Sequence, residues 1–151
     1  MIKRIYSSLL KEYGRQRWWP VTPKGKLHPV YSGGPASTEQ QFEVIVGAVL
    51  TQNTAWKNVE LALVELNRRQ LLSCEKILKI RRDRLARLIK SSGYFNQKAI
   101  KLKEVCNFLT QTPVEALEEM ETRELRDTLL GVKGIGPETA DSIILYALGK
   151  P

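Results

Sequence analysis

A glycine-rich segment near the C-terminus has the residue types of a turn that binds phosphate through its backbone. It reads Leu129-Leu130-Gly131-Val132-Lys133-Gly134-Ile135-Gly136-Pro137-Glu138-Thr139-Ala140, with a proline placed to open the next helix. Glycine permits positive φ and lets a ligand approach the backbone without a side chain in the way. The N–H groups at the start of that helix face outward at the positive end of its dipole, where they can bind a phosphate without reading base sequence. The alternative is an ordinary tight turn between two helices.

The chain has too few histidines and cysteines for most other kinds of catalytic or metal site. The single histidine, His28, excludes a histidine-rich metal site, and serine–histidine catalysis would have to use that residue. Two cysteines, Cys74 and Cys106, are too few for a multi-disulfide framework or a four-cysteine metal site. We therefore expect no metal and no cofactor within this chain.

Charge is spread unevenly along the sequence. The chain has 24 Lys and Arg against 16 Asp and Glu, a net charge of +8. Residues 76–103 hold ten basic residues and one acid, whereas residues 112–131 hold six acids and two bases. A basic excess of that size favours an anionic partner, with nucleic acid as the first candidate. The alternative is a solvated, lysine-rich helix face.

Length and composition bound the class of protein. The 151 residues suffice for one compact domain, and 42% hydrophobic with 26% charged residues is typical of a soluble globular chain. No apolar run approaches the roughly 20 residues of a membrane span, and the N-terminus lacks the apolar core of a signal peptide. These features predict a soluble, intracellular protein in the cytoplasm, with no membrane association.

The elements that must position these residues are helices, because apolar residues repeat at helical spacing and no segment alternates long enough to predict a sheet. Residues 42–50 are apolar nearly all round, which predicts a central buried helix that opens with a capping box at Thr38. Residues 18–37 hold four of the seven prolines and are expected to be irregular. The predicted class is all-α, with about eight helices, over residues 2–14, 38–50, 55–68, 74–90 (one or two helices), 97–110, 113 onward, 122–131 and 137–149.

Three segments in this order resemble the helix-hairpin-helix DNA glycosylases of the endonuclease III superfamily. Phe42 to Asn58 (FEVIVGAVLTQNTAWKN) is similar to the buried helix and DNA-facing turn of that family, and Gly93 to Ala99 to its G-x-x-N-x-K-A helix start. The third segment is the hairpin from Leu129 to Ala140. The resemblance implies two helical subdomains. Residues 1–37 would give an N-terminal helix and long loop to one, and residues 38–151 a helical barrel ending in the helix-hairpin-helix at 123–148.

The resemblance also implies how such a protein meets DNA. A damaged nucleotide is flipped out of the duplex into the cleft between the subdomains. The side chain that fills the vacated space would be Gln52 or Asn53, whose amides can hydrogen-bond to the orphaned base. The alternative is helix-end capping by Asn53 or Thr54, and both roles are compatible. By the same resemblance, the residues expected to bind DNA phosphate are Lys98 and the hairpin residues Val132, Lys133, Gly134, Ile135, Gly136 and Thr139. The expected partner is damaged double-stranded DNA, bound by a monomer associated with the nucleoid.

Glu138 and the tryptophans indicate which branch of the family this chain resembles. Bifunctional members carry a lysine nucleophile where this chain has Glu138, and a carboxylate cannot form a Schiff base, so a monofunctional glycosylase is expected. Glutamate in a first helical turn is also simply favoured by the helix dipole. The 3-methyladenine DNA glycosylase III branch has a similar WWP and QNT, which implies a base pocket near Glu138 lined by Trp18, Trp19, Pro20 and Trp56. Aromatic faces stack well on positively charged alkylated purines. The alternative is that the tryptophans are core residues.

The chain departs from the family pattern at its C-terminus. The catalytic aspartate of the family would fall a few residues beyond Pro151, and Asp141 lies inside the helix and does not replace it. We therefore expect an N-terminal fragment or truncated product that is inactive alone, with an iron–sulfur cluster conceivable only in a longer product. Two further hypotheses remain: a non-catalytic helix-hairpin-helix DNA-binding module, and an iron–sulfur glycosylase and abasic-site lyase of the endonuclease III type.

Overall fold

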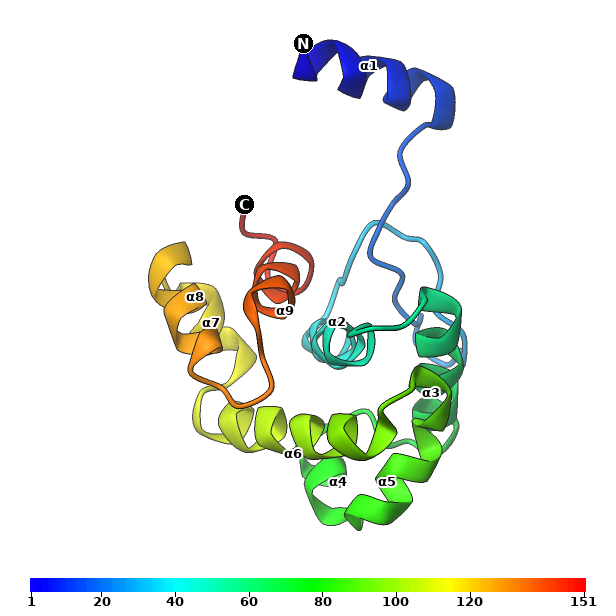
Figure 1. Ribbon diagram of the computed structural model, residues 1–151, viewed down its shortest axis with the longest axis vertical. Coiled ribbons are helices and arrows are strands. Elements are labelled where there is room, and N and C mark those ends of the chain that lie inside the picture. The colour runs from blue at the N-terminus through cyan, green and yellow to red at the C-terminus, as the bar shows by residue number, and fades with distance from the viewer.

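The helix α2, Thr38–Leu50, lies at the centre of the computed structural model, which describes residues 1–151 (Figure 1). Its apolar sequence explains this position, because every residue from 42 to 50 is buried. The hydroxyl of Ser37 accepts a hydrogen bond from the N–H of Gln40 and caps the helix. The capping residue is therefore Ser37, one position before the predicted Thr38, because Ser37 has the extended backbone that a cap requires.

The helices that follow α2 in the chain surround it, and α2 is seen end-on in Figure 1. Those that pack against it are α3 (Trp56–Arg68), α6 (Phe95–Gln111), α7 (Val114–Glu119), α9 (Pro137–Ser142) and the π-helical η2 (Ile143–Ala147). The remaining elements of this body are α4 (Cys74–Lys79), α5 (Arg82–Leu88), the 3-10 turn η1 (Lys90–Ser92) and α8 (Thr122–Leu130). The predicted all-α class is confirmed. None of these helices combines the length and apolar character that crossing a membrane requires.

Helix α1, Ile2–Tyr13, stands apart from the rest of the protein (Figure 1). None of its residues is buried, and its apolar face, which includes Ile5, Tyr6 and Leu9, is exposed. The apolar repeat therefore predicts the helix correctly, while no segment of this chain covers its apolar face.

The irregular segment after α1 rejoins the core at Trp19 and Val21. Val21 pairs with Val30 across an isolated antiparallel bridge, and Glu43 of α2 accepts hydrogen bonds from the N–H (3.0 Å) and the hydroxyl (2.7 Å) of Thr22. Burial raises the pKa of the Glu43 carboxyl. Trp19 and Val21 belong to the same buried core as α2. The division of the chain into subdomains at residue 37 stays a prediction.

Candidate functional site

The hairpin between α8 and α9 is closed by its own hydrogen bonds and by two buried apolar side chains. The Val132 N–H donates to the carbonyl of Leu129, and the Ile135 N–H donates to the carbonyl of Val132, each at 3.0 Å. Both side chains lie in the core. The turn itself uses the N–H groups of Val132 and Ile135, so neither is free for the predicted phosphate contact.

Other N–H groups of the hairpin remain available to a ligand. Those of Lys133, Gly134 and Gly136 make no hydrogen bond within the protein. Gly136 caps α9, whose first residue is Pro137, so its N–H lies at the positive end of the following helix. Phosphate binding by these three residues stays a prediction that the geometry permits.

Gly134 lies where the hairpin approaches α6 most closely. Its φ is +100°, and a Cβ atom there would lie 2.5 Å from Cγ of Lys101, so only glycine fits without a shift. Gly136 differs, because its backbone is extended and an added Cβ would meet nothing within 4 Å. A side chain at Gly136 would therefore obstruct a ligand and leave the protein's own packing unchanged.

Gln52, in the turn after α2, joins that turn to the hairpin. Its side-chain nitrogen donates to the carbonyl of Gly134 at 3.1 Å and to the hydroxyl of Thr139 at 3.0 Å. Its side-chain oxygen accepts a hydrogen bond from Lys101. The hydroxyl of the predicted phosphate ligand Thr139 is buried and already an acceptor. Gln52 therefore faces the hairpin.

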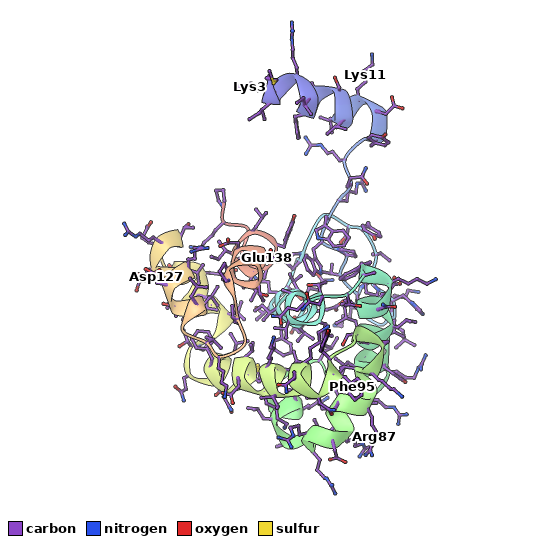
Figure 2. The ribbon with its side chains drawn as sticks, in the orientation of Figure 1. Lys3, Lys11, Arg87, Phe95, Asp127 and Glu138 are labelled. Carbon is purple, nitrogen blue, oxygen red and sulfur yellow. The ribbon has the colours of Figure 1, made fainter.

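Asn53 is the other candidate for the wedge, the side chain that would fill the space left by a flipped nucleotide. It faces solvent. It is exposed and has a left-handed backbone, with φ of +54°. With Gln52 and Lys101 it borders an open hollow of about 580 Å³ whose other wall is the hairpin and the start of α9. Glu138 also borders this hollow and is exposed; Figure 2 shows it on α9, above α6 in that view.

Lys98 is buried in this structure, so its ammonium is not free for the predicted phosphate contact. Its side chain is 2% exposed, and its ammonium donates to the carbonyls of Leu50 (2.7 Å) and Ser92 (2.5 Å). Burial, and secondarily the charge of Lys101, lowers the pKa of Lys98 to about 8. Lys98 links the end of α2 to the turn before α6. It therefore supports from behind the wedge turn, residues 51–54, which holds Gln52 and Asn53.

One residue at this site, Lys101, is missing from the predicted set. Lys101 lies one helical turn after Lys98 and does face the hollow, which its position in a basic helix could have indicated.

The three tryptophans converge, although dozens of residues separate Trp56 from the pair. Ring centroids are 5.3 Å apart for Trp18 and Trp19, 5.1 Å for Trp18 and Trp56, and 5.5 Å for Trp19 and Trp56, all edge-to-face. Tyr31 packs on Trp18, and Tyr146 on Trp19. The three indoles thus form one cluster, and their role as a base pocket stays a prediction.

The environments of these indoles differ. Trp19 is 4% exposed and Pro20 is buried, so the core interpretation holds for both, whereas Trp18 and Trp56 are half-buried. The indole N–H of Trp19 is buried without a hydrogen-bond partner. The hollow beside Glu138 is lined by none of the three tryptophans. A base pocket that they share with Glu138 stays a prediction for the whole protein.

Comparison with known proteins finds similar sequences. One is a protein of Methanocaldococcus jannaschii that is provisionally named DNA repair glycosylase MJ1434. It is 43% identical over 99% of this chain and 62% of its own length. Endonuclease III of Sulfolobus acidocaldarius is 28% identical over 72% of this chain and 48% of its own.

Solved structures show the same fold. The H. pylori 3-methyladenine DNA glycosylase MagIII, crystallised with 1,N6-ethenoadenine, superposes with a TM-score of 0.71 and 30% identity over 99% of this chain and 64% of that one. MBOgg1 in complex with a low-affinity DNA ligand is similar in fold, with a TM-score of 0.60 and 21% identity over 72% of this chain and 41% of that one.

The present chain thus spans less than two thirds of the length of these relatives. Residues 46–145 match the model of the HhH-GPD superfamily of base excision DNA repair proteins, a stretch that includes the wedge turn, Lys101 and the hairpin. The chain therefore belongs to the HhH-GPD superfamily.

Proposed function

We propose that these residues form the DNA-binding and base-flipping part of a base excision glycosylase, which hydrolyses the N-glycosidic bond of a damaged base in duplex DNA. The observation that carries the proposal is the contact of Gln52 with Gly134 and Thr139. It brings exposed Asn53 and the free hairpin N–H groups to one hollow. A wedge beside a phosphate anchor is what base flipping requires, because the backbone must be held while one nucleotide leaves the stack.

The hairpin would hold DNA without regard to sequence. Backbone N–H groups contact phosphate alone, and the net charge of +8 adds a general attraction to the duplex. Such a protein would act as a monomer in the cytoplasm, at the nucleoid, where its substrate lies.

Glu138 favours hydrolysis without strand cleavage. Glu138 lies in the first turn of α9 and borders the hollow. By the resemblance to the family, bifunctional members would have a nucleophilic lysine at this position. A carboxylate cannot form a Schiff base with the sugar, so the abasic product would be released intact.

The aromatic cluster favours an alkylated base as substrate. Trp18 and Trp56 are half-buried, so each residue is partly accessible, and an alkylated purine such as 3-methyladenine carries positive charge. Stacking of such a base on indole has a cation–π component of about 0.5–2 kcal/mol. MagIII, which this chain resembles in fold and sequence, is named for 3-methyladenine, a base of this class.

The hydrolytic carboxylate of the whole enzyme lies outside these residues in our proposal. Asp141 is held in a two-point ion pair with Arg126, at 2.6 and 3.2 Å, which lowers the pKa of its carboxyl and links α8 to α9. It is therefore a structural residue. Cys74 and Cys106 do not fit an iron–sulfur cluster, since four thiolates are needed, and no group of His, Cys, Asp or Glu in this chain is arranged to hold a metal.

The experiment compares duplexes with and without a stable abasic-site analogue. Fluorescence anisotropy with residues 1–151 should give tighter binding to the analogue-containing duplex, because a missing base lowers the cost of unpairing. Base release from a 3-methyladenine duplex should require a longer protein that includes the carboxylate. Equal affinity for both duplexes would contradict base flipping, and binding without base release by the longer protein would favour a non-catalytic module.

A further inference from the structure

A second basic surface lies on the other side of α6 from the hairpin. The chain folds α4 and α5 around a groove of about 600 Å³ with an apolar floor, lined by five cations and no acid: Arg69, Lys76, Lys79, Arg84 and Arg87. In Figure 2 Arg87 lies below α6 and Glu138 above it, so the groove is separate from the hollow at the hairpin.

The cations of the groove are available to a ligand. Arg69, Lys76 and Arg84 are exposed and form no ion pair, while Lys79 pairs with Glu75 and Arg87 with Asp83 at the surface. Exposed ion pairs contribute little, about 0–1 kcal/mol, so these two side chains can turn to an anion at small cost. Five cations against two paired acids, Glu75 and Asp83, leave an excess of positive charge that favours a polyanionic ligand.

The helices that carry these cations are held in place. Lys103 of α6 donates from its ammonium to the carbonyls of Ile77 (2.8 Å), Leu78 (2.8 Å) and Ile80 (2.7 Å), which closes the C-terminal end of α4. Both α4 and α5 pack against α6, the helix that also contacts the hairpin through Lys101. One rigid helix therefore fixes the groove relative to the hollow.

We propose that this groove binds the phosphate backbone of the DNA duplex that flanks the lesion, an inference that rests on the proposed function. The occupant is a duplex because that ligand already lies at the hairpin, on the opposite side of a single helix. A helix with its side chains is about 10–12 Å across, and phosphates of one strand follow every ~3.4 Å along the duplex axis. The groove therefore contacts phosphates about three or more base pairs from the flipped nucleotide.

The test compares a short duplex of about 6 base pairs with a long one of about 20, both with a central abasic-site analogue, using residues 1–151. The groove variant is Lys76→Gln with Arg84→Gln. The matched control is Lys24→Gln with Lys26→Gln, which removes the same charge from an exposed loop elsewhere. Thermal unfolding of both variants verifies that they fold, since all four side chains are exposed.

The groove variant should bind the long duplex about tenfold more weakly, with a log–log salt slope smaller by about 1.8 because two phosphate contacts are lost. Its affinity for the short duplex, and both affinities of the control, should match the wild type. Equal weakening on both duplexes would overturn the inference, as would unchanged binding of the long duplex together with lost binding of an acidic polyglutamate peptide. Failure of the wild type to bind either duplex would instead refute the proposed function.

Discussion

The side-chain amide of Gln52 donates to the carbonyl of Gly134 at 3.1 Å, and this contact fixes the turn after α2 against the hairpin 82 residues later in the chain. Gln52 also holds Thr139 and accepts from Lys101. The two elements expected to hold DNA thus form one rigid unit. Asn53, the next residue, takes no part in these contacts and faces solvent.

The two amides of the wedge turn should separate stability from recognition. Gln52→Ala should lower the free energy of unfolding by about 1–2 kcal/mol, because a part-buried carbonyl and a lysine lose their partner. Asn53→Gly should leave stability unchanged, since glycine accepts the positive φ, yet reduce the preference for an abasic-site duplex. Urea unfolding and anisotropy measure the two effects. Unchanged lesion preference in Asn53→Gly would remove Asn53 as the wedge.

The lowered pKa of Lys98 predicts an unusual dependence of the free energy of unfolding on pH. Its pKa is about 8 in the folded protein against 10.5 for an unburied lysine, so between these values the folded state binds fewer protons than the unfolded state. Stability should therefore rise as pH increases from about 8 towards 10.5, because deprotonation relieves the cost of burying the charge.

The control is Lys98→Met, a residue of similar length without charge. It should be less stable by about 1–3 kcal/mol below pH 8, because the carbonyls of Leu50 and Ser92 lose their donor. The rise with pH should be smaller in this variant than in the wild type. Parallel urea titrations across this range would refute the assignment if both proteins showed the same slope.

The aromatic cluster should divide into a structural and a binding residue. Trp19→Ala should cost about 3–5 kcal/mol, as expected for a large aromatic side chain in the core. Trp56→Ala, at a half-buried position, should cost less stability. In the whole enzyme it should nevertheless lower excision of an alkylated base about ten- to a hundredfold, since a stacked base contributes about 1–3 kcal/mol. Excision at the wild-type rate by Trp56→Ala would remove Trp56 from the pocket.

The hairpin and the central helix are predictable from sequence because their signals are local. Glycine at Gly134 meets a positive φ, Pro137 opens a helix, and the apolar run of α2 is buried as its pattern predicts. The position of a cap is less certain, since Ser37 and Thr38 have similar side chains and the backbone alone selects Ser37.

Lys98 could not be predicted correctly, because its burial depends on two carbonyls, of Leu50 and Ser92, that only the tertiary fold brings to it. In the sequence it is one of several basic residues and has the properties of a surface lysine. The same holds for the backbone of Val132 and Ile135, because the sequence of a turn does not reveal which N–H groups form hydrogen bonds within the turn. Side-chain types predict the elements here, and contacts between elements decide which groups remain free.

The central claim is that DNA phosphate approaches the backbone of the hairpin at Gly136, and one matched pair of variants tests it directly. Gly136→Ala places a methyl group in open space on an extended backbone. Gly131→Ala adds the same group to the residue that caps the end of α8, outside the hollow, where its Cβ would lie 3.3 Å from the carbonyl oxygen of Thr128. Anisotropy with an abasic-site duplex should show at least about tenfold weaker binding for Gly136→Ala, about 1.4 kcal/mol, and wild-type binding for Gly131→Ala. Wild-type affinity in a folded Gly136→Ala protein would contradict the account.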